Sequence, residues 1–164
     1  MSFTLRQPAL PDAPRIAELH VATWREAYSH LLPGDFFTED HIQGRHQMWN
    51  HILGNPREEW SIQIAESRGQ IIGFAFFGPS YGADCQELPR ARQLFSIYVA
   101  AEHYGAGVGQ ALLDATAGDE PAMLWVAKDN PRAVAFYLRN GFEFDGAEQT
   151  DPGAAKIVGA RMVR

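Results

Sequence analysis

The chain has little cysteine, no run of positive charge and no long apolar segment. Cys85 is its only cysteine, which excludes an internal disulfide and a zinc site built from several cysteines. No segment reaches the roughly 18 uncharged apolar residues that a membrane-spanning helix needs. Pro8 and Pro11 stand where a secretory signal would have an apolar stretch. We therefore expect a cytoplasmic protein that does not enter membranes and uses no metal ion.

The charge balance is acidic. The 164 residues include 14 Lys and Arg against 20 Asp and Glu, which gives a net charge of −6. Proteins that bind nucleic acid neutralise phosphates with Lys and Arg, so we expect no nucleic-acid partner. The length and the 46% apolar content suit one domain over residues 1–164, with a core of its own.

The hydrophobic pattern alternates between the periods of strands and helices. Ala17, Val21, Trp24 and Tyr28 are spaced by four, three and four residues, which places them on one helical face. Asp12, with Pro14 in the first turn, is placed to cap the start of that helix. We expect strands over 3–7, 61–65, 70–77, 93–100, 122–127, 142–144 and 156–163. We expect helices beginning at residue 12 and covering 36–53, 108–117 and 130–140.

This order of elements predicts the fold class. It reads strand, two helices, three strands, helix, strand, helix and two strands. Such an order favours an α/β (α+β) protein with a mixed central sheet of about seven strands, flanked by about four helices.

A glycine-rich turn joins the strand over 93–100 to the helix over 108–117. Alternate glycines let the backbone approach a ligand, and a helix N-terminus offers free N–H groups to an anion. The turn is not a Walker-type phosphate loop, because Gly109 is followed by Gln110 and not by Lys. A dinucleotide-binding pattern needs a glycine five residues after Gly105, where this chain has Gln110. On these residues alone, anion binding and a purely structural tight turn both stay open.

Two wider blocks carry a family resemblance. Leu94–Val99 (Leu-Phe-Ser-Ile-Tyr-Val), Gly105–Gly109 and then Ala-Leu-Leu resemble the acetyl-CoA-binding motif of the GNAT superfamily of N-acetyltransferases. The second block, Asn-Pro-Arg-Ala over 130–133 with Phe-Tyr at 136–137 and Gly-Phe at 141–142, agrees with it at the right distance. The resemblance covers residues 3–164. It departs at Tyr104, where the family usually has Gln or Arg, and at Ala106, where Arg or Lys is frequent; we expect somewhat weaker cofactor binding.

The resemblance implies acetyl-CoA as co-substrate, with its pantetheine arm along the end of the strand and its phosphates on the amides of residues 104–110. It also implies two catalytic groups. The Val99 amide would polarise the thioester carbonyl, and Tyr137 would protonate the departing sulfur. Packing alone is the alternative for Tyr137, and helix capping alone for Asn130. The residues expected to bind the cofactor are Ile97, Tyr98, Val99, Tyr104, Gly105, Ala106, Gly107, Val108, Gly109, Gln110, Asn130 and Tyr137.

The acceptor is the least specified part. By resemblance, Trp24 and Tyr28 wall the acceptor pocket, although packing on the sheet is an alternative for both. Candidate general bases are Glu26, His30, Asp84 and Glu87, with water in their place as the alternative, and Cys85 is expected to be a plain loop cysteine.

We expect direct acetyl transfer in a ternary complex to a primary amine of a small molecule or to a peptide N-terminus. The net charge of −6 makes a cationic amine the easier acceptor. The alternative function is an acyl-CoA-binding module without turnover, and a homodimer is possible by analogy with the family.

Overall fold

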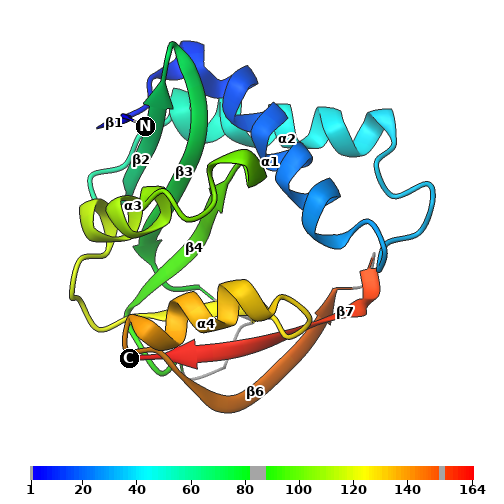
Figure 1. The fold of residues 1–164 in the computed structure, drawn as a ribbon, viewed down its shortest axis with the longest axis vertical. Helices are drawn as coiled ribbons and strands as arrows, with labels where there is room; N and C mark the ends of the chain where they lie inside the picture. Colours follow the sequence, from blue (N-terminus) through cyan, green and yellow to red (C-terminus); the bar gives the residue numbers. More distant parts are fainter. Residues whose placement is uncertain (1, 82–87, 152–153) are drawn as a thin grey trace.

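One mixed sheet organises the molecule (Figure 1). The structure is a computed structural model that describes residues 2–81, 88–151 and 154–164. Its strand order is β1-β2-β3-β4-β5-β7-β6, and β4–β5 is the parallel pair. The strands are β1 (Thr4–Arg6), β2 (Ser61–Ser67), β3 (Gln70–Pro79), β4 (Arg92–Val99), β5 (Met123–Ala127), β6 (Glu143–Asp151) and β7 (Ala154–Val163). The helices are α1 (Ala13–Tyr28), α2 (Glu39–Gly54), α3 (Val108–Thr116) and α4 (Pro131–Arg139), with short 3-10 turns η1 (Leu10–Asp12) and η2 (Ala101–His103). The predicted fold class and element order are confirmed.

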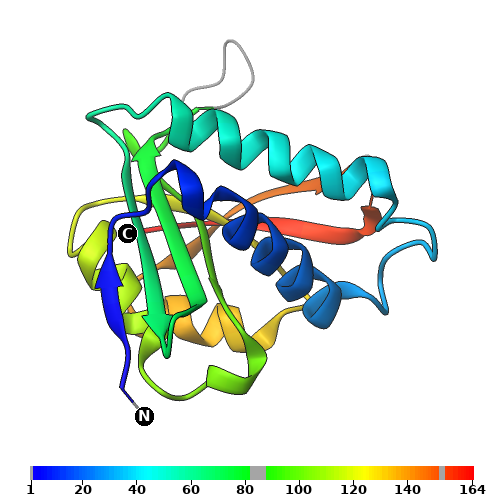
Figure 2. The same ribbon diagram turned by 90° about the horizontal axis from the view of Figure 1, so that it is seen from above.

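Helices cover both faces of the sheet, with α1 and α2 on one face and α3 and α4 on the other (Figure 2). Successive residues of a strand point to opposite faces. Ile64 and Phe74 accordingly pack against α1 and α2, whereas the next residues, Ala65 and Ala75, pack against α3. In the described part of the chain, no helix has both the length and the apolar character to span a membrane.

Asp12 does not cap α1 with its side chain, contrary to the prediction. Its carboxylate instead accepts hydrogen bonds from the Ala9 amide and from the guanidinium groups of Arg6 and Arg15, each at 2.8 Å. These partners hold the pKa of Asp12 below its usual range, with the bond from Arg6 as the largest cause. Charge pairing therefore replaces capping at this position.

Two other element boundaries differ from the prediction. The second helix begins at Glu39, and not near residue 36, because the Thr38 hydroxyl accepts a hydrogen bond from the His41 amide (3.2 Å) and caps it there. β6 runs to Asp151, well beyond the predicted 142–144. Its polar sequence lacks a strand pattern, and pairing with β7 on one side holds it extended.

The two halves of the sheet separate between β4 and β5. The strands pair only at Gln93–Met123 and Leu94–Leu124. Just beyond this point Phe95 is an extra residue in β4, since Phe76 pairs with Ser96 and Phe77 with Leu94. Such a bulge bends its strand. Figure 1 shows β4 diverging from the half of the molecule that carries β7, β6 and α4.

Candidate active site

Two adjoining cavities lie at the divergence of β4 and β5. The first, of about 430 Å³, is bounded by α1, β4, β5, β7 and the start of α4. The second, of about 380 Å³, is bounded by the end of β4, the glycine turn, α3 and α4. The residues that line both are Ile97, Val99, Tyr104, Arg132, Ala133 and Tyr137. Two ligands bound side by side would therefore meet at this shared wall.

The end of β4 offers a backbone donor to the cavities. Ala100 donates its amide to the Ile72 carbonyl on β3 (2.9 Å). Because amides alternate in direction along an antiparallel strand, the Val99 N–H points away from β3, into the space that β5 has left. The side chains of Ile97 and Val99 line the second cavity, whereas Tyr98 lines the first cavity only.

The glycine turn presents a helix N-terminus to the second cavity. Gly105 and Gly107 have φ values of +78° and +84°, the left-handed region that favours glycine. The first helical hydrogen bond of α3 runs from Ala111 to the Gly107 carbonyl (3.1 Å), so the amides of 107–110 precede it and face an anion-binding position. Of the predicted phosphate donors, Tyr104 and Ala106 use their amides inside the turn, at 3.1 and 3.4 Å.

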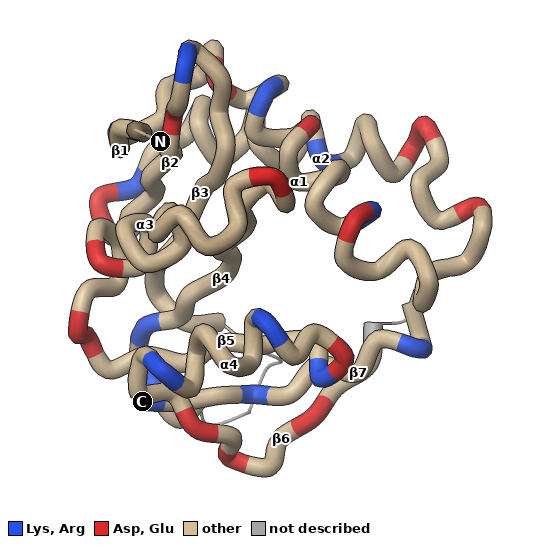
Figure 3. Tube along the Cα trace, viewed as in Figure 1, with Lys and Arg blue, Asp and Glu red and all other residues tan. Residues whose placement is uncertain are grey.

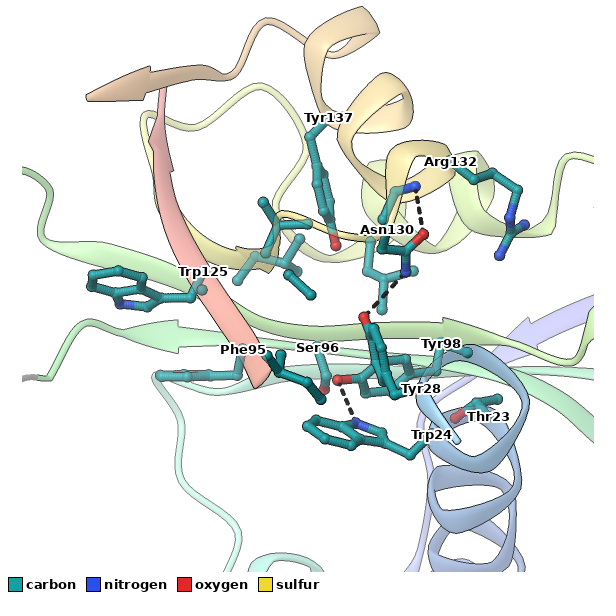
Figure 4. Close-up of a pocket in the computed structure, with 18 of the residues that line it drawn as sticks. Thr23, Trp24, Tyr28, Phe95, Ser96, Tyr98, Trp125, Asn130, Arg132 and Tyr137 are labelled. Atoms are coloured by element: carbon teal, nitrogen blue, oxygen red, sulfur yellow. Dashed lines mark hydrogen bonds between the residues drawn. The ribbon is translucent and has the colours of Figure 1, made fainter. Parts of the chain in front are cut away.

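Tyr137 projects from α4 into the opening (Figure 4). Its ring packs edge-to-face with Phe136 and Phe142, yet it lines both cavities, and its hydroxyl makes no hydrogen bond to any described residue. Burial raises the pKa of Tyr137 well above its usual value, so the phenol stays protonated. The two interpretations of this residue are compatible, because a packed ring carries a hydroxyl that is free to donate a proton.

Asn130 caps α4 and also joins it to α1. Its side-chain oxygen accepts a hydrogen bond from the Ala133 amide (3.2 Å), which confirms the capping prediction. Its side-chain nitrogen donates to the Tyr28 hydroxyl (3.1 Å), as Figure 4 shows. This pair bridges α1 and α4 beside the first cavity.

Trp24 and Tyr28 stand in the wall of the first cavity. The Trp24 indole N–H donates to the Tyr98 hydroxyl (3.0 Å), and its ring stacks on Phe36 with centres 6.2 Å apart. Burial raises the pKa of Tyr98 to about 12, so this hydroxyl is neutral. Both helix residues therefore pack and line the cavity at once.

The candidate general bases receive no support from the structure. Glu26 and His30 are exposed and line neither cavity. Asp84, Glu87 and Cys85 lie outside the described residues. Within the described lining of the first cavity, the ionisable side chains are tyrosines and Arg132. Figure 3 shows the charges of both signs mixed along the rest of the trace.

Comparison with known proteins agrees with this geometry. Residues 58–144 match the model of the acetyltransferase (GNAT) domain family. A probable N-acetyltransferase of Mycobacterium tuberculosis is 33% identical over 141 residues, which cover 82% of this chain and 76% of that protein. The chain belongs to the GNAT acetyltransferase family. An uncharacterised N-acetyltransferase of Bacillus subtilis is 28% identical over the same coverage. The PaiA N-acetyltransferase of Thermoplasma acidophilum, crystallised with coenzyme A, shares the fold with a TM-score of 0.71 at 16% identity, over 98% of each chain.

Several residues of this GNAT site escaped the sequence prediction, and three of them bring aromatic or charged side chains to the first cavity. Phe95 and Trp125 line the first cavity, and Arg132 lines both. Arg132 lies inside the block that carried the resemblance, so its position gave a usable signal. Phe95 lies inside the other block, Leu94–Val99, but was given no role there, and Trp125 carries no signal, because an aromatic residue in a strand is most simply explained by core packing.

Proposed function

We propose that this GNAT protein transfers the acetyl group of acetyl-CoA to the primary amine of a small molecule or a peptide N-terminus, by direct attack in a ternary complex. The observation that carries the proposal is the meeting of two cavities at one wall. That wall holds both an outward-facing strand amide, at Val99, and, at Tyr137, a hydroxyl that makes no hydrogen bond to any described residue.

The second cavity fits the co-substrate. The amides at the start of α3 suit phosphate groups, and Ile97 and Val99 offer an apolar strand end to the pantetheine arm. The open space above Gly105 and Gly107, where an added Cβ would meet no atom within 4 Å, leaves room for a ligand close to the backbone. PaiA, which has this fold, was crystallised with coenzyme A, and this also supports the assignment.

The residues at the shared wall suit the chemistry of acyl transfer. The amine nitrogen forms a bond to the acetyl carbon while the carbon–sulfur bond breaks. The Val99 N–H is placed to donate to the carbonyl oxygen as negative charge gathers there. Tyr137 gives its proton to the leaving sulfur and regains one from solvent, and the amine loses its own proton to water.

The first cavity supports an acceptor with an apolar body. Its described wall includes the aromatic side chains of Trp24, Tyr28, Phe95 and Trp125, and its charged member, Arg132, is positive. The net charge of −6 favours a cationic amine over the molecule as a whole, but the described lining of the first cavity contains no carboxylate to pair with one. We therefore place amines with an aromatic or aliphatic body ahead of polyamines.

Thiol release from acetyl-CoA tests the proposal. The panel contains arylalkylamines, amino-acid amides, polyamines and short peptides, each compared with an amine-free control. Release that depends on an amine, with the acetylated amine found by mass spectrometry, supports the acetyltransferase. Thermal stabilisation by acetyl-CoA without release for any amine supports the acyl-CoA-binding module instead. Stabilisation by NAD and not by coenzyme A refutes both.

A further inference from the structure

Arg132 and Tyr104 form a stacked pair at the junction of the two cavities. The guanidinium carbon of Arg132 lies 3.1 Å from the centre of the Tyr104 ring, and both residues line both cavities. Tyr104 immediately precedes the glycine turn, whereas Arg132 belongs to the first turn of α4. Their contact therefore joins two walls of the second cavity. A guanidinium lying over an aromatic face is held there by cation–π attraction.

The stack orients the guanidinium without using its hydrogen-bond donors. The N–H groups of arginine lie in the plane of the guanidinium, so a ring against its face leaves them available. Among the described residues Arg132 has no ion pair, and its side chain is exposed to the opening. The pair thus presents an oriented positive charge that no carboxylate of the described residues neutralises.

The opposite wall of the second cavity is suited to the same anion. The N–H groups at the start of α3, which form the positive end of the helix dipole, face the second cavity. Residues 104–110 contain no Lys or Arg, so the turn has no cationic side chain. Arg139 also lines the cavity, and the neighbouring Asn140 accepts a hydrogen bond from Gln110 at the start of α3 (2.9 Å). Arg132 is the arginine whose guanidinium contacts Tyr104, the residue that precedes the glycines.

We propose that Arg132, held on the face of Tyr104, binds the pyrophosphate of acetyl-CoA against the N-terminus of α3. The proposal rests on the proposed function, because it takes acetyl-CoA as the co-substrate. Arg132 is the binding residue, and Tyr104 is a positioning residue that acts through it. In this arrangement Tyr104 does not weaken cofactor binding. The departure from the family pattern at this position had suggested that it would. The cationic side chain that binds the pyrophosphate belongs to α4, because the turn itself has none.

Calorimetric titration with coenzyme A, in the absence of any amine, tests both roles. Arg132→Ala should weaken binding about tenfold or more, because it removes a charge-assisted hydrogen bond to phosphate. Tyr104→Ala should weaken binding several-fold, and Tyr104→Phe, which keeps the ring, should bind within about twofold of the wild type. The double variant with Ala at both positions should bind no more weakly than Arg132→Ala alone, since the two residues act as a unit. Lys156→Ala is the control, because it removes an equal charge from outside both cavities.

Truncated ligands identify the group that Arg132 binds. The loss in Arg132→Ala should persist with 3′-dephospho-CoA, which keeps the pyrophosphate, and vanish with pantetheine, which lacks it. A loss confined to ligands with the 3′-phosphate, or an effect on the KM of the amine alone, overturns the proposal. Unchanged binding of coenzyme A by Arg132→Ala also overturns it. Binding needs no turnover, so a wild-type protein that binds coenzyme A but never releases thiol refutes the acetyltransferase function alone. The affinities of Arg132→Ala and Tyr104→Ala for coenzyme A then still support or overturn the role of Arg132.

Discussion

Replacing Tyr137 by Phe separates its two roles. The substitution removes the hydroxyl and keeps the ring, whose contacts with Phe136 and Phe142 persist. The hydroxyl has no hydrogen-bond partner among the described residues, so its removal breaks no bond and leaves no buried group unpaired. We therefore expect a free energy of unfolding within about 0.5 kcal/mol of the wild type. A purely structural role predicts no further change.

The catalytic role predicts a lower kcat. General acids contribute typically about 10²–10⁴-fold. Tyr137 should lie at or below the low end of this range, because burial raises its pKa above the usual value of about 10, while a thiol has a pKa near 8.5. Proton transfer to the departing sulfur is thus uphill. We expect Tyr137→Phe to lower kcat about 10- to 100-fold, with the Kd for acetyl-CoA changed less than about twofold.

The assay is thiol release at saturating acetyl-CoA and amine, between pH 7 and 9. The phenol stays protonated over this whole range, since its pKa is raised, so the ratio of wild-type to variant kcat should not vary with pH. A kcat within twofold of the wild type at every pH would remove Tyr137 from the mechanism. A ratio that falls steeply toward pH 9 would contradict the raised pKa.

Other variants test the surroundings of the site. Burial lowers the pKa of His20 from 6.5 to about 3, so the folded protein binds fewer protons than the unfolded chain. Stability is then complete above pH 6.5 and falls as the pH falls, by about 2 kcal/mol between pH 8 and 5; urea unfolding should show this in the wild type and a flatter profile in His20→Gln. Asn130→Ala should cost about 1 kcal/mol in urea unfolding by removing the cap of α4, and Asn130→Asp, which keeps the capping oxygen, should cost less. Trp24→Phe should raise the KM of the amine several-fold and leave that of acetyl-CoA unchanged, because its lost hydrogen bond borders only the first cavity; equal changes in both would refute this. Gly107→Ala should cost about 1–2 kcal/mol through its φ of +84°, whereas Gly34→Ala, at a position without positive φ, should cost less.

Local signals in the sequence predicted the elements well. The run over Arg92–Val99 is rich in β-branched and aromatic residues, and α1 has a clear helical period, so the pattern and the packing agree. The glycine turn was located correctly, because Gly105 and Gly107 do adopt the conformation for which glycine is required.

Features that depend on distant partners could not be predicted in this way. The separation of β4 from β5 begins beside an extra residue, Phe95, whose bulge exists only relative to the pairing of β3. Asp12 carries the local signal of a helix cap, but Arg6 and Arg15 supply stronger partners. The stack of Arg132 on Tyr104 joins residues 28 positions apart and has no periodic signature.

Residue-resolved NMR of the ¹⁵N-labelled protein, titrated with acetyl-CoA, tests the central claim most directly. The claim is that the co-substrate lies between the end of β4 and the start of α3. It predicts that the amides of Val99, Gly105 and 107–110 shift most strongly and saturate together, while NAD shifts none of them. Saturable shifts centred elsewhere, or an unperturbed glycine turn in the presence of bound acetyl-CoA, would contradict the account.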